Sequence, residues 1–266
     1  MTLSRFGRPL LAAILCLSAG AALAAEDDQS STTPAIEALR AHLAEEFPRF
    51  QVDAIRPTPL DGVYEVVSNT DVMYMGADGR YLLRGQLIDL QAKRNLTGQR
   101  RSQLVHARVE ALGEESMVVF GRDDVAAGNT ITVFTDPTCP YCRKLHEDVL
   151  QMVEQYPVQV RYLMFPRQGL QSGAADQLRD IWCADDPQQA LTRAKRGQSV
   201  PERDDGCKTP LRQHFQAARA VGVNGTPFLM IGDGGPVFSG YRPTSELLSM
   251  LGISPDQGQA QAGASD

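Results

Sequence analysis

The sequence lacks an excess of positive charge. Its 26 Lys and Arg residues are outnumbered by 32 Asp and Glu residues, the formal net charge is -6, and no basic tract is present. Because proteins that bind nucleic-acid phosphates need clustered positive charge, we expect no nucleic-acid partner. Apolar residues at 42% and charged residues at 22% are ordinary globular proportions. This composition excludes a disordered chain and a fibre.

Long apolar runs are also scarce, and the one near the start is too short to span a bilayer, which takes about 20 residues. Residues 1–24 contain Arg5 and Arg8, then an apolar part, then small residues that end at Ala24. This order predicts a cleavable secretory signal. No lipid attachment is expected at Cys16, because Leu15 precedes it rather than a small residue. We therefore expect a soluble, exported protein.

Cysteine is rare, with five in the chain, one of them in the predicted signal. The other four are Cys139, Cys142, Cys183 and Cys207, an even number for an oxidising compartment, and they permit three pairings. The first two form a CxxC, which can close locally. Cys183 and Cys207 would then form a structural crosslink, worth roughly 3 kcal/mol in the chain-entropy treatment. We interpret the CxxC as the pair that carries chemistry.

The length of 266 residues favours two domains. In the first, predicted over residues 25–96, apolar spacing indicates a helix at 34–47, and β-branched and aromatic runs indicate strands at 63–67, 72–75 and 81–90. Such a small core favours self-association. The alternative is that this part simply packs on the second domain.

A polar helix is predicted over residues 97–114, followed by a second domain over 115–254 and a frayed, low-complexity tail over 255–266. The second domain mixes both kinds of element, which makes the fold class α/β (α+β). Its expected strands are 116–120, 130–135, 158–165, 228–231 and 237–241. Its expected helices follow Cys142 and cover 174–182, 188–196, 211–221 and 244–251, with Gly222 as a C-terminal cap.

The CxxC stands where a predicted strand meets a predicted helix. A cysteine at a helix N-terminus faces unpaired N–H groups and the positive end of the helix dipole, which favour the thiolate. Cys139 is therefore the candidate nucleophile. Pro140 suits the first helical turn, where no N–H is needed. Cys142 lies one turn further, shielded, as the candidate resolving thiol.

Other interpretations of this region are weaker. Cys139, Cys142 and His146 could supply three zinc ligands, but no fourth ligand is evident and Pro140 separates the cysteines, so no metal is expected. We expect His146 to be partly solvated and without a catalytic role. From sequence alone the Thr226–Pro227 bond is expected to be trans.

Several segments together resemble the bacterial periplasmic disulfide isomerases of the DsbC type. The resemblance covers nearly all of the mature length and is more specific than a bare CxxC. It is carried by ITVFTD at 131–136, RKLH at 143–146, RYLMFPRQGL at 161–170, IWC at 181–183 and GTP at 225–227.

The resemblance implies a thioredoxin-fold catalytic domain with a helical insertion, and a small cystatin-like α+β dimerisation domain joined to it by a linker helix. It implies that Thr226–Pro227 is cis and lies beside the cysteines. Substrate contact is implied for Thr226, Pro227, Pro140 and Tyr141, including added-strand pairing with a client at Thr226. Dimer contact is implied near residues 81–87, where Gly85 permits close backbone approach.

The resemblance also implies activity, location and partners. The expected function is a periplasmic disulfide isomerase and reductase, in which reduced Cys139 attacks incorrect disulfides of exported proteins and Cys142 resolves the mixed disulfide. A membrane thiol reductase of the DsbD type would supply electrons, and no cofactor is implied. The mature protein would be a homodimer whose apolar cleft holds misfolded chains.

Two positions depart from family patterns. Pro140-Tyr141 replaces the Gly-Tyr of DsbC and is similar to DsbG, and this dipeptide bears on the reduction potential and on substrate choice. Val133 stands where thioredoxins carry a buried acid, so no carboxylate proton shuttle is expected there. The alternatives are a DsbG-like reductase of sulfenic acids on single cysteines, a redox-independent holdase chaperone, and a plain oxidant, for which a dimer is a poor shape.

Overall fold

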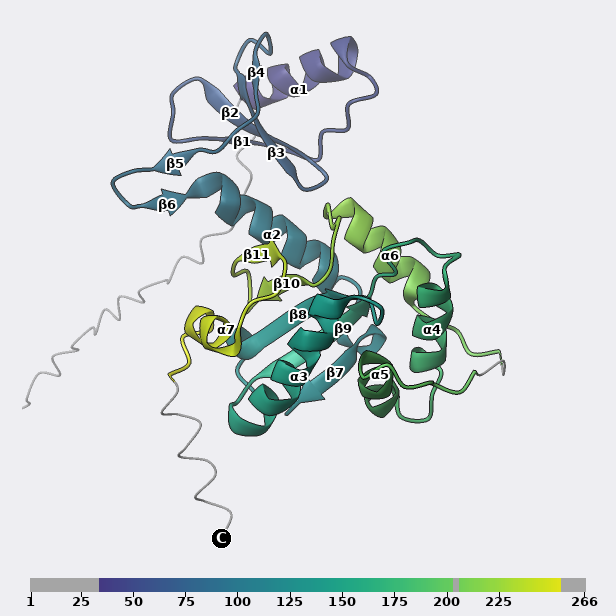
Figure 1. Cartoon of the computed structure of the whole chain (residues 1–266). Helices are drawn as coiled ribbons and strands as arrows, with labels where there is room; N and C mark the ends of the chain where they lie inside the picture. Colours follow the sequence, from purple (N-terminus) through teal and green to yellow (C-terminus); the bar gives the residue numbers. More distant parts are fainter. Residues whose placement is uncertain (1–33, 203–205, 255–266) are drawn as a thin grey trace, which may run out of the picture. The chain divides into compact units, whose positions relative to one another are not determined.

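A helix packed on a small antiparallel sheet forms the first part of the computed structural model, which describes residues 34–202 and 206–254 (Figure 1). The predicted signal at 1–24 and the tail at 255–266 lie outside the described residues. The elements are α1 (Pro34–Glu46), β1 (Ala54–Pro57), β2 (Val63–Ser68), β3 (Asp71–Gly76) and β4 (Leu82–Leu83), with the strands in the order β1-β2-β3-β4. Their core joins Ile36, Leu39 and Leu43 of α1 to Ile55, Val66 and Met75 of the sheet.

The predicted single strand at 81–90 is wrong. Instead, β4 ends at Leu83, and a separate hairpin pairs β5 (Ile88–Asp89) with β6 (Arg94–Asn95). Leu87, which lies between β4 and β5, is bonded to the start of the next helix. Its N–H donates to Thr97 Oγ1 at 2.7 Å, and its carbonyl accepts from Leu96 N at 2.9 Å. These bonds take Leu87 out of any pairing with β3. The sequence analysis also missed β1.

Helix α2 (Leu96–Glu110) follows the hairpin directly. Asn95 caps it, because its side-chain oxygen accepts the N–H of Gly98 at 2.9 Å. Val105 and Val109, near its C-terminal end, are buried in a cluster with Phe134, Leu163 and Met230 of the following sheet. The polar helix predicted at 97–114 is thus present but ends at Glu110, and one face of it is part of the next core.

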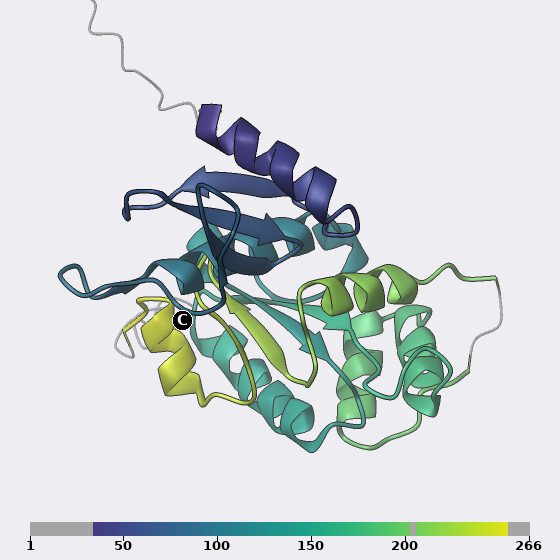
Figure 2. The ribbon, with the colours of Figure 1, turned by 90° about the horizontal axis from the view of Figure 1, so that it is seen from above.

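The second sheet has the strand order β11-β10-β8-β9-β7, seen from above in Figure 2. Strands β8 and β9 are parallel and the other pairs are antiparallel. The strands are β7 (Val118–Gly121), β8 (Thr130–Thr135), β9 (Gln159–Met164), β10 (Phe228–Ile231) and β11 (Val237–Ser239). The helices are α3 (Pro140–Gln155), α4 (Gly173–Trp182), α5 (Pro187–Lys195), α6 (Leu211–Ala220) and α7 (Thr244–Met250), and short 3-10 turns cover Glu114–Ser116 and Ala127–Asn129.

Alternation along the strands divides the core into two layers. Ile131 and Val133 of β8 face a cluster that includes residues of α3, α4, α5 and α7, whereas Phe134 faces the cluster that includes α2 and α6. The predicted α/β (α+β) class with a thioredoxin-type sheet and a helical insertion is confirmed. Gly222, with φ +79°, follows the last turn of α6 as expected. In the part of the chain that is described, no helix is both long and apolar enough for a membrane span.

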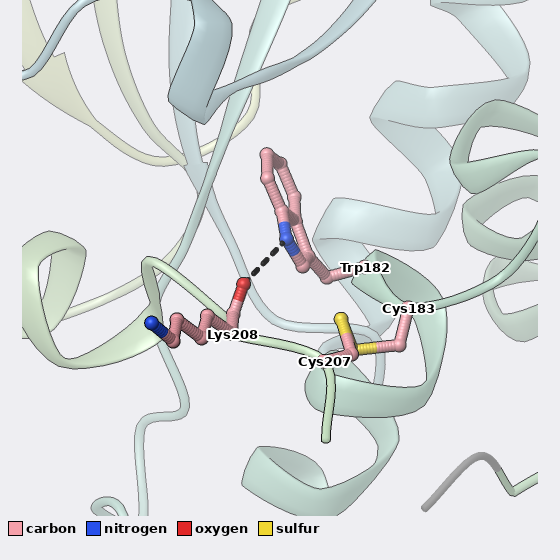
Figure 3. The surroundings of a disulfide bond; sticks show 4 residues. All are labelled: Trp182, Cys183, Cys207 and Lys208. Atoms are coloured by element: carbon pink, nitrogen blue, oxygen red, sulfur yellow. Dashed lines mark hydrogen bonds between the residues drawn. A yellow bond between two sulfur atoms is a disulfide. The ribbon is translucent and has the colours of Figure 1, made fainter. Parts of the chain in front are cut away.

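A disulfide closes the helical insertion. It joins Cys183, at the end of α4, to Cys207, with their Cα atoms 5.9 Å apart (Figure 3). Beside it, Trp182 Nε1 donates to the carbonyl of Lys208 at 3.2 Å. All of α5 lies in the loop that this bond closes, so the crosslink restrains the position of α5.

Candidate active site

Two free cysteines lie at the start of α3, immediately after the central strand β8 and a short turn. Cys139 is the N-cap residue of α3 with extended backbone, and Pro140 occupies the first helical position. The side chain of Cys139 makes no capping bond. The N–H groups of Tyr141 and Cys142 lie close enough to its sulfur to stabilise a thiolate. Cys142 follows one turn along. The CxxC therefore stands at the strand-to-helix junction that the sequence predicted.

The turn before Cys139 is held by Asp136, which is fully buried. Its carboxylate accepts from Thr138 N at 2.8 Å, Thr138 Oγ1 at 2.6 Å, Arg167 N at 2.9 Å and Arg167 Nε at 3.2 Å. Burial opposes ionisation of this carboxyl, but the bonds from Thr138 and Arg167 outweigh it and hold its pKa below the usual value. A buried anion thus fixes the backbone that delivers the first cysteine.

The loop before β10 forms the other wall of the site. The Thr226–Pro227 bond is cis, so the trans bond expected from the sequence alone is wrong and the cis bond that the resemblance implied is confirmed. The Cys139 thiol donates to the Thr226 carbonyl at 3.3 Å. Among the described residues, the buried Thr226 hydroxyl has no hydrogen-bond partner in the thiol state. It is available to donate to the sulfur once Cys139 loses its proton.

The pKa of Cys139 is lowered to about 5. The largest cause is the hydrogen bond from the Cys142 thiol, and burial acts in the opposite direction. Further bonds from Thr226 and from the N–H groups of Cys142 and Tyr141 also stabilise the thiolate. Burial raises the pKa of Cys142 well above the usual value, and its bond to Cys139 adds to the rise. At neutral pH one sulfur is therefore a thiolate and the other a thiol.

The sulfur of the candidate nucleophile is recessed. Cys139 is only 2% exposed, whereas the neighbouring Tyr141 is 64% exposed. The Thr226–Pro227 loop lies close to the sulfur, since the Cys139 thiol bonds to the Thr226 carbonyl, and Pro140 follows Cys139 directly in the chain. A reaction partner must therefore come close to Tyr141 and the Thr226–Pro227 loop to reach Cys139.

The expectation that His146 is partly solvated is wrong, because its side chain is fully buried. Its Nδ1 lies 3.0 Å from Tyr162 Oη and its Nε2 3.0 Å from Thr192 Oγ1. Thr192 Oγ1 donates its own proton to the Gln188 carbonyl, so it accepts from Nε2, and Nδ1 accepts from Tyr162. Burial lowers the pKa of His146 to about 4, and the charge of Lys195 adds to this. Its spacing with Cys142 and Val149 on the buried face of α3 was a usable sequence signal.

Sequence reasoning missed Lys195 entirely. This residue ends α5 and is only 2% exposed. Its Nζ donates to Thr135 Oγ1 and, at 3.1 Å, to the carbonyl of Asp136. Val133, where thioredoxins carry an acid, is fully buried in the core. The buried ionisable group behind the cysteines is thus a cation from the insertion and not a carboxylate from β8.

No group of three or more His, Cys, Asp or Glu side chains is arranged to hold a metal ion within residues 34–202 and 206–254. The two sulfurs of the site differ, one activated and one shielded. A thioredoxin-type sheet that places such a pair at a helix start beside a cis-proline loop defines a thiol:disulfide oxidoreductase.

Comparison with known proteins shows to which family within this class the chain belongs. Residues 21–98 match the family described as "Disulfide bond isomerase protein N-terminal domain", and residues 109–252 match "Thioredoxin-like domain". The chain is 36% identical over 199 residues to the thiol:disulfide interchange protein DsbC of Dickeya dadantii, across 74% of this chain and 79% of that protein. The chain belongs to the DsbC family of thiol:disulfide interchange proteins.

The chain is also similar to a second DsbC protein and to a solved structure. The DsbC protein of Escherichia coli K12 is 35% identical over 199 residues, which cover 74% of this chain and 80% of that protein. Among solved structures, a disulfide interchange protein from Neisseria gonorrhoeae is 28% identical, with a TM-score of 0.45, and the match covers 52% of this chain and 95% of that chain.

Proposed function

We propose that this protein is a periplasmic disulfide isomerase and reductase of exported proteins, with Cys139 as the nucleophile and Cys142 as the resolving thiol. The observation that carries the proposal is the placement of the two sulfurs: Cys139 is the N-cap of α3 and lies 3.3 Å from the Thr226 carbonyl, while Cys142 is buried one turn further along the helix. This placement lowers the pKa of Cys139 to about 5 and raises that of Cys142. Only a thiolate attacks a disulfide, so one sulfur is ready to react while its neighbour is held back.

The reaction begins when the Cys139 thiolate attacks one sulfur of an incorrect client disulfide. A bond forms between Cys139 and that sulfur, the client bond breaks, and the second client sulfur leaves as a thiolate. In isomerisation this thiolate attacks another client disulfide, and a client thiolate finally displaces Cys139. In reduction Cys142 attacks Cys139, so the client leaves reduced and the protein retains a Cys139–Cys142 disulfide, which an external thiol reductase must open.

Client binding in this proposal uses Thr226, Pro227, Pro140 and Tyr141. The Thr226 carbonyl lies 3.3 Å from the Cys139 sulfur, so a client segment that pairs with this loop as an added strand brings its own sulfur within reach. The exposed ring of Tyr141 offers an apolar contact beside the sulfur.

We further propose that residues 25–96 dimerise, 97–114 link and 115–254 carry catalysis. Strand β4 is a two-residue edge strand, and the apolar side chains in and around it are exposed, namely Tyr81 (62%), Leu82 (44%), Leu83 (61%), Ile88 (47%) and Leu90 (84%). An added Cβ at Gly85 would meet nothing within 4 Å, which leaves room for a second chain. Such an edge favours pairing between two copies. Leu83→Lys is expected to give a monomer by sedimentation, and a variant that stays dimeric would contradict this contact.

Refolding of scrambled ribonuclease tests the function. The reduced protein is expected to restore ribonuclease activity, and Cys139→Ala is expected to lose this effect. Full rescue by Cys139→Ala would instead show a redox-independent holdase. The Pro140-Tyr141 pair supports a second candidate, a DsbG-like reductase: no ribonuclease recovery together with rapid reduction of a sulfenic acid on a single cysteine would replace the isomerase proposal.

The proposed setting is the periplasm, with a membrane thiol reductase of the DsbD type as electron donor. The trapped redox state of Cys139 and Cys142 in cells tests the electron supply, because an isomerase must be kept largely reduced. A mostly oxidised pair in cell extracts would contradict a dedicated electron donor.

A further inference from the structure

A buried lysine stands behind the two cysteines. Lys195 is 2% exposed, and burial lowers its pKa to about 8, against the favourable charges of Cys142, Asp136 and Cys139. Lysines are seldom buried so completely, because removing an ammonium group from water is costly. The hydrogen bonds to Thr135 Oγ1 and the Asp136 carbonyl satisfy two of its donors. A long apolar side chain would fill the same space without this cost.

The helix faces turn this lysine toward Cys142, and its charge acts on that thiol. On α3, Cys142 and His146 are four residues apart and share one face. On α5, Thr192 and Lys195 are three residues apart and share one face of that helix. The bond of 3.0 Å between His146 and Thr192 joins these two faces, so Lys195, one turn beyond Thr192, lies toward Cys142. Its bond to the Asp136 carbonyl brings its Nζ to the backbone just before the cysteines.

We propose that Lys195 is a positioning residue for the resolving step: its buried positive charge stabilises the Cys142 thiolate that must form when Cys142 attacks the mixed disulfide. The inference rests on the proposed roles of Cys139 and Cys142. Lys195 thus supplies a buried charge behind the resolving thiol. The acid that thioredoxins carry is absent here, because Val133 occupies its position.

In the resolving step Cys142 loses its proton, its thiolate forms a bond to Cys139 Sγ, and the bond between Cys139 and the client breaks. The client sulfur leaves with the electron pair and takes up a proton, so the client is reduced while Cys139 and Cys142 are oxidised. Lys195 keeps its own proton throughout and acts only through its charge.

Other charged groups define the environment of this lysine. Asp136, Cys142 and Cys139 favour its charged form, and Arg143 on α3 opposes it. The neutral ring of His146 also faces it, since the charge of Lys195 contributes to the lowered pKa of that histidine. When Cys139 enters a mixed disulfide its negative charge disappears. Asp136 and the developing Cys142 thiolate then remain as the anions near Lys195.

Two variants test the role of the charge. Lys195→Met fills the space without charge, and Lys195→Gln keeps a hydrogen-bond donor for Thr135 without charge. Lys144→Met is the matched control, because Lys144 lies exposed on α3 near the same cysteines. The reduced proteins are mixed with dithiobis-nitrobenzoate, which releases one coloured thiolate when Cys139 attacks and a second when Cys142 resolves the mixed disulfide.

A positive charge close to a thiol lowers the pKa of that thiol by about 1–3 units. The larger thiolate fraction speeds attack by Cys142, and the lower basicity of this thiolate offsets part of the gain. At pH 7 both Lys195 variants are therefore expected to slow the second release roughly 3- to 50-fold and to change the first by less than about threefold. Lys144→Met should match the parent in both phases. The difference should vanish at high pH, because the parent lysine loses its charge as the pH rises through about 8.

Three outcomes would overturn the proposal. They are an unchanged second release in both variants, equal slowing of both phases, and recovery of the parent rate in Lys195→Gln, which would assign Lys195 a hydrogen-bonding role. If Lys195→Met fails to fold, Lys195→Gln carries the same test. Absence of a first release in the parent would instead defeat the proposed function itself.

Discussion

The sulfurs of Cys139 and Cys142 belong to one helical turn yet hold their protons very differently. The lowered pKa of Cys139 has the bond from Cys142 as its largest cause, ahead of Thr226 and the backbone N–H groups. The resolving thiol is thus also the main stabiliser of the attacking thiolate. Removal of either sulfur should change the chemistry of the other.

Alkylation across a pH series measures this dependence. In the reduced protein the rate of Cys139 alkylation is expected to reach half its maximum near pH 5. In Cys142→Ala the midpoint should rise by about one unit, since a charge-assisted bond is lost. Cys139→Ala should take up almost no label at neutral pH, because the pKa of Cys142 is raised. A parent midpoint near that of free cysteine would contradict the assigned nucleophile.

Asp136 offers a second test, on stability. Asp136→Asn removes a buried carboxylate that accepts bonds from Thr138 and Arg167, and we expect it to lower the free energy of unfolding by about 1.5–3 kcal/mol. Because the folded pKa of Asp136 is lowered, its stabilising contribution exists above the unfolded pKa and is lost as the pH falls through the folded value. Urea unfolding should show the two proteins converging in acid.

The exposed Arg122–Asp124 pair supplies the control for this measurement. Asp124→Asn changes the same chemical group at the surface, where ion pairs contribute little. It should leave the urea midpoint unchanged. Equal losses in Asp124→Asn and Asp136→Asn would show that the buried contacts of Asp136 are not the cause.

At this scale the CxxC motif predicted Cys139 and Cys142. The cis form of the Thr226–Pro227 bond was implied by the resemblance alone, because the sequence by itself favours a trans bond. The sequence did not predict Lys195. A lysine near a helix end is usually solvated, and its burial depends on the packing of α5 against α3, which involves residues distant in sequence. His146 is an intermediate case, since its helical spacing was visible but its partners Tyr162 and Thr192 were not.

Among the elements, those with strong periodicity were predicted best. Strands β8 and β10 and helix α1 match their expected ranges closely, since their apolar pattern and their tertiary environment agree. The segment 81–90 has the composition of a strand, but Leu87 bonds to the start of α2 instead. Whether Leu87 pairs with β3 or bonds to the start of α2 is decided by tertiary contacts, which the composition of the segment does not show.

The insertion that carries α5 depends on the crosslink at its base. Replacement of both Cys183 and Cys207 by Ala is expected to lower the free energy of unfolding by about 3 kcal/mol, because the unfolded chain regains the freedom of the closed loop. Urea unfolding of parent and double variant checks this value. The first release from dithiobis-nitrobenzoate should persist in the double variant, which shows that the site still forms, and an unchanged urea midpoint would contradict a structural role for the bond.

Across the whole molecule, buried histidines predict sensitivity to acid. Burial lowers the pKa of both His146 and His214 to about 4. The unfolded chain therefore binds protons near pH 6.5 that the folded chain excludes until about pH 4, and stability falls between these values. Each histidine is expected to contribute a loss of about 2 kcal/mol between pH 7 and pH 5.

Urea unfolding at the two pH values tests the assignment through His214→Gln. His214 Nδ1 accepts from Met164 N at 3.2 Å, so protonation of the ring would break this bond. The variant should be less stable at pH 7 but should lose less stability on acidification than the parent. An equal loss in parent and variant would mean that His214 does not cause the acid sensitivity.

The small exposure of Cys139 beside a prominent Tyr141 has one more consequence. A disulfide inside a rigid native client cannot reach the buried sulfur of Cys139, whereas a disulfide in a flexible segment of an incompletely folded client can. In the proposed reaction, steric access thus acts as proofreading: correct bonds in completed proteins are spared, and errors in immature ones are opened.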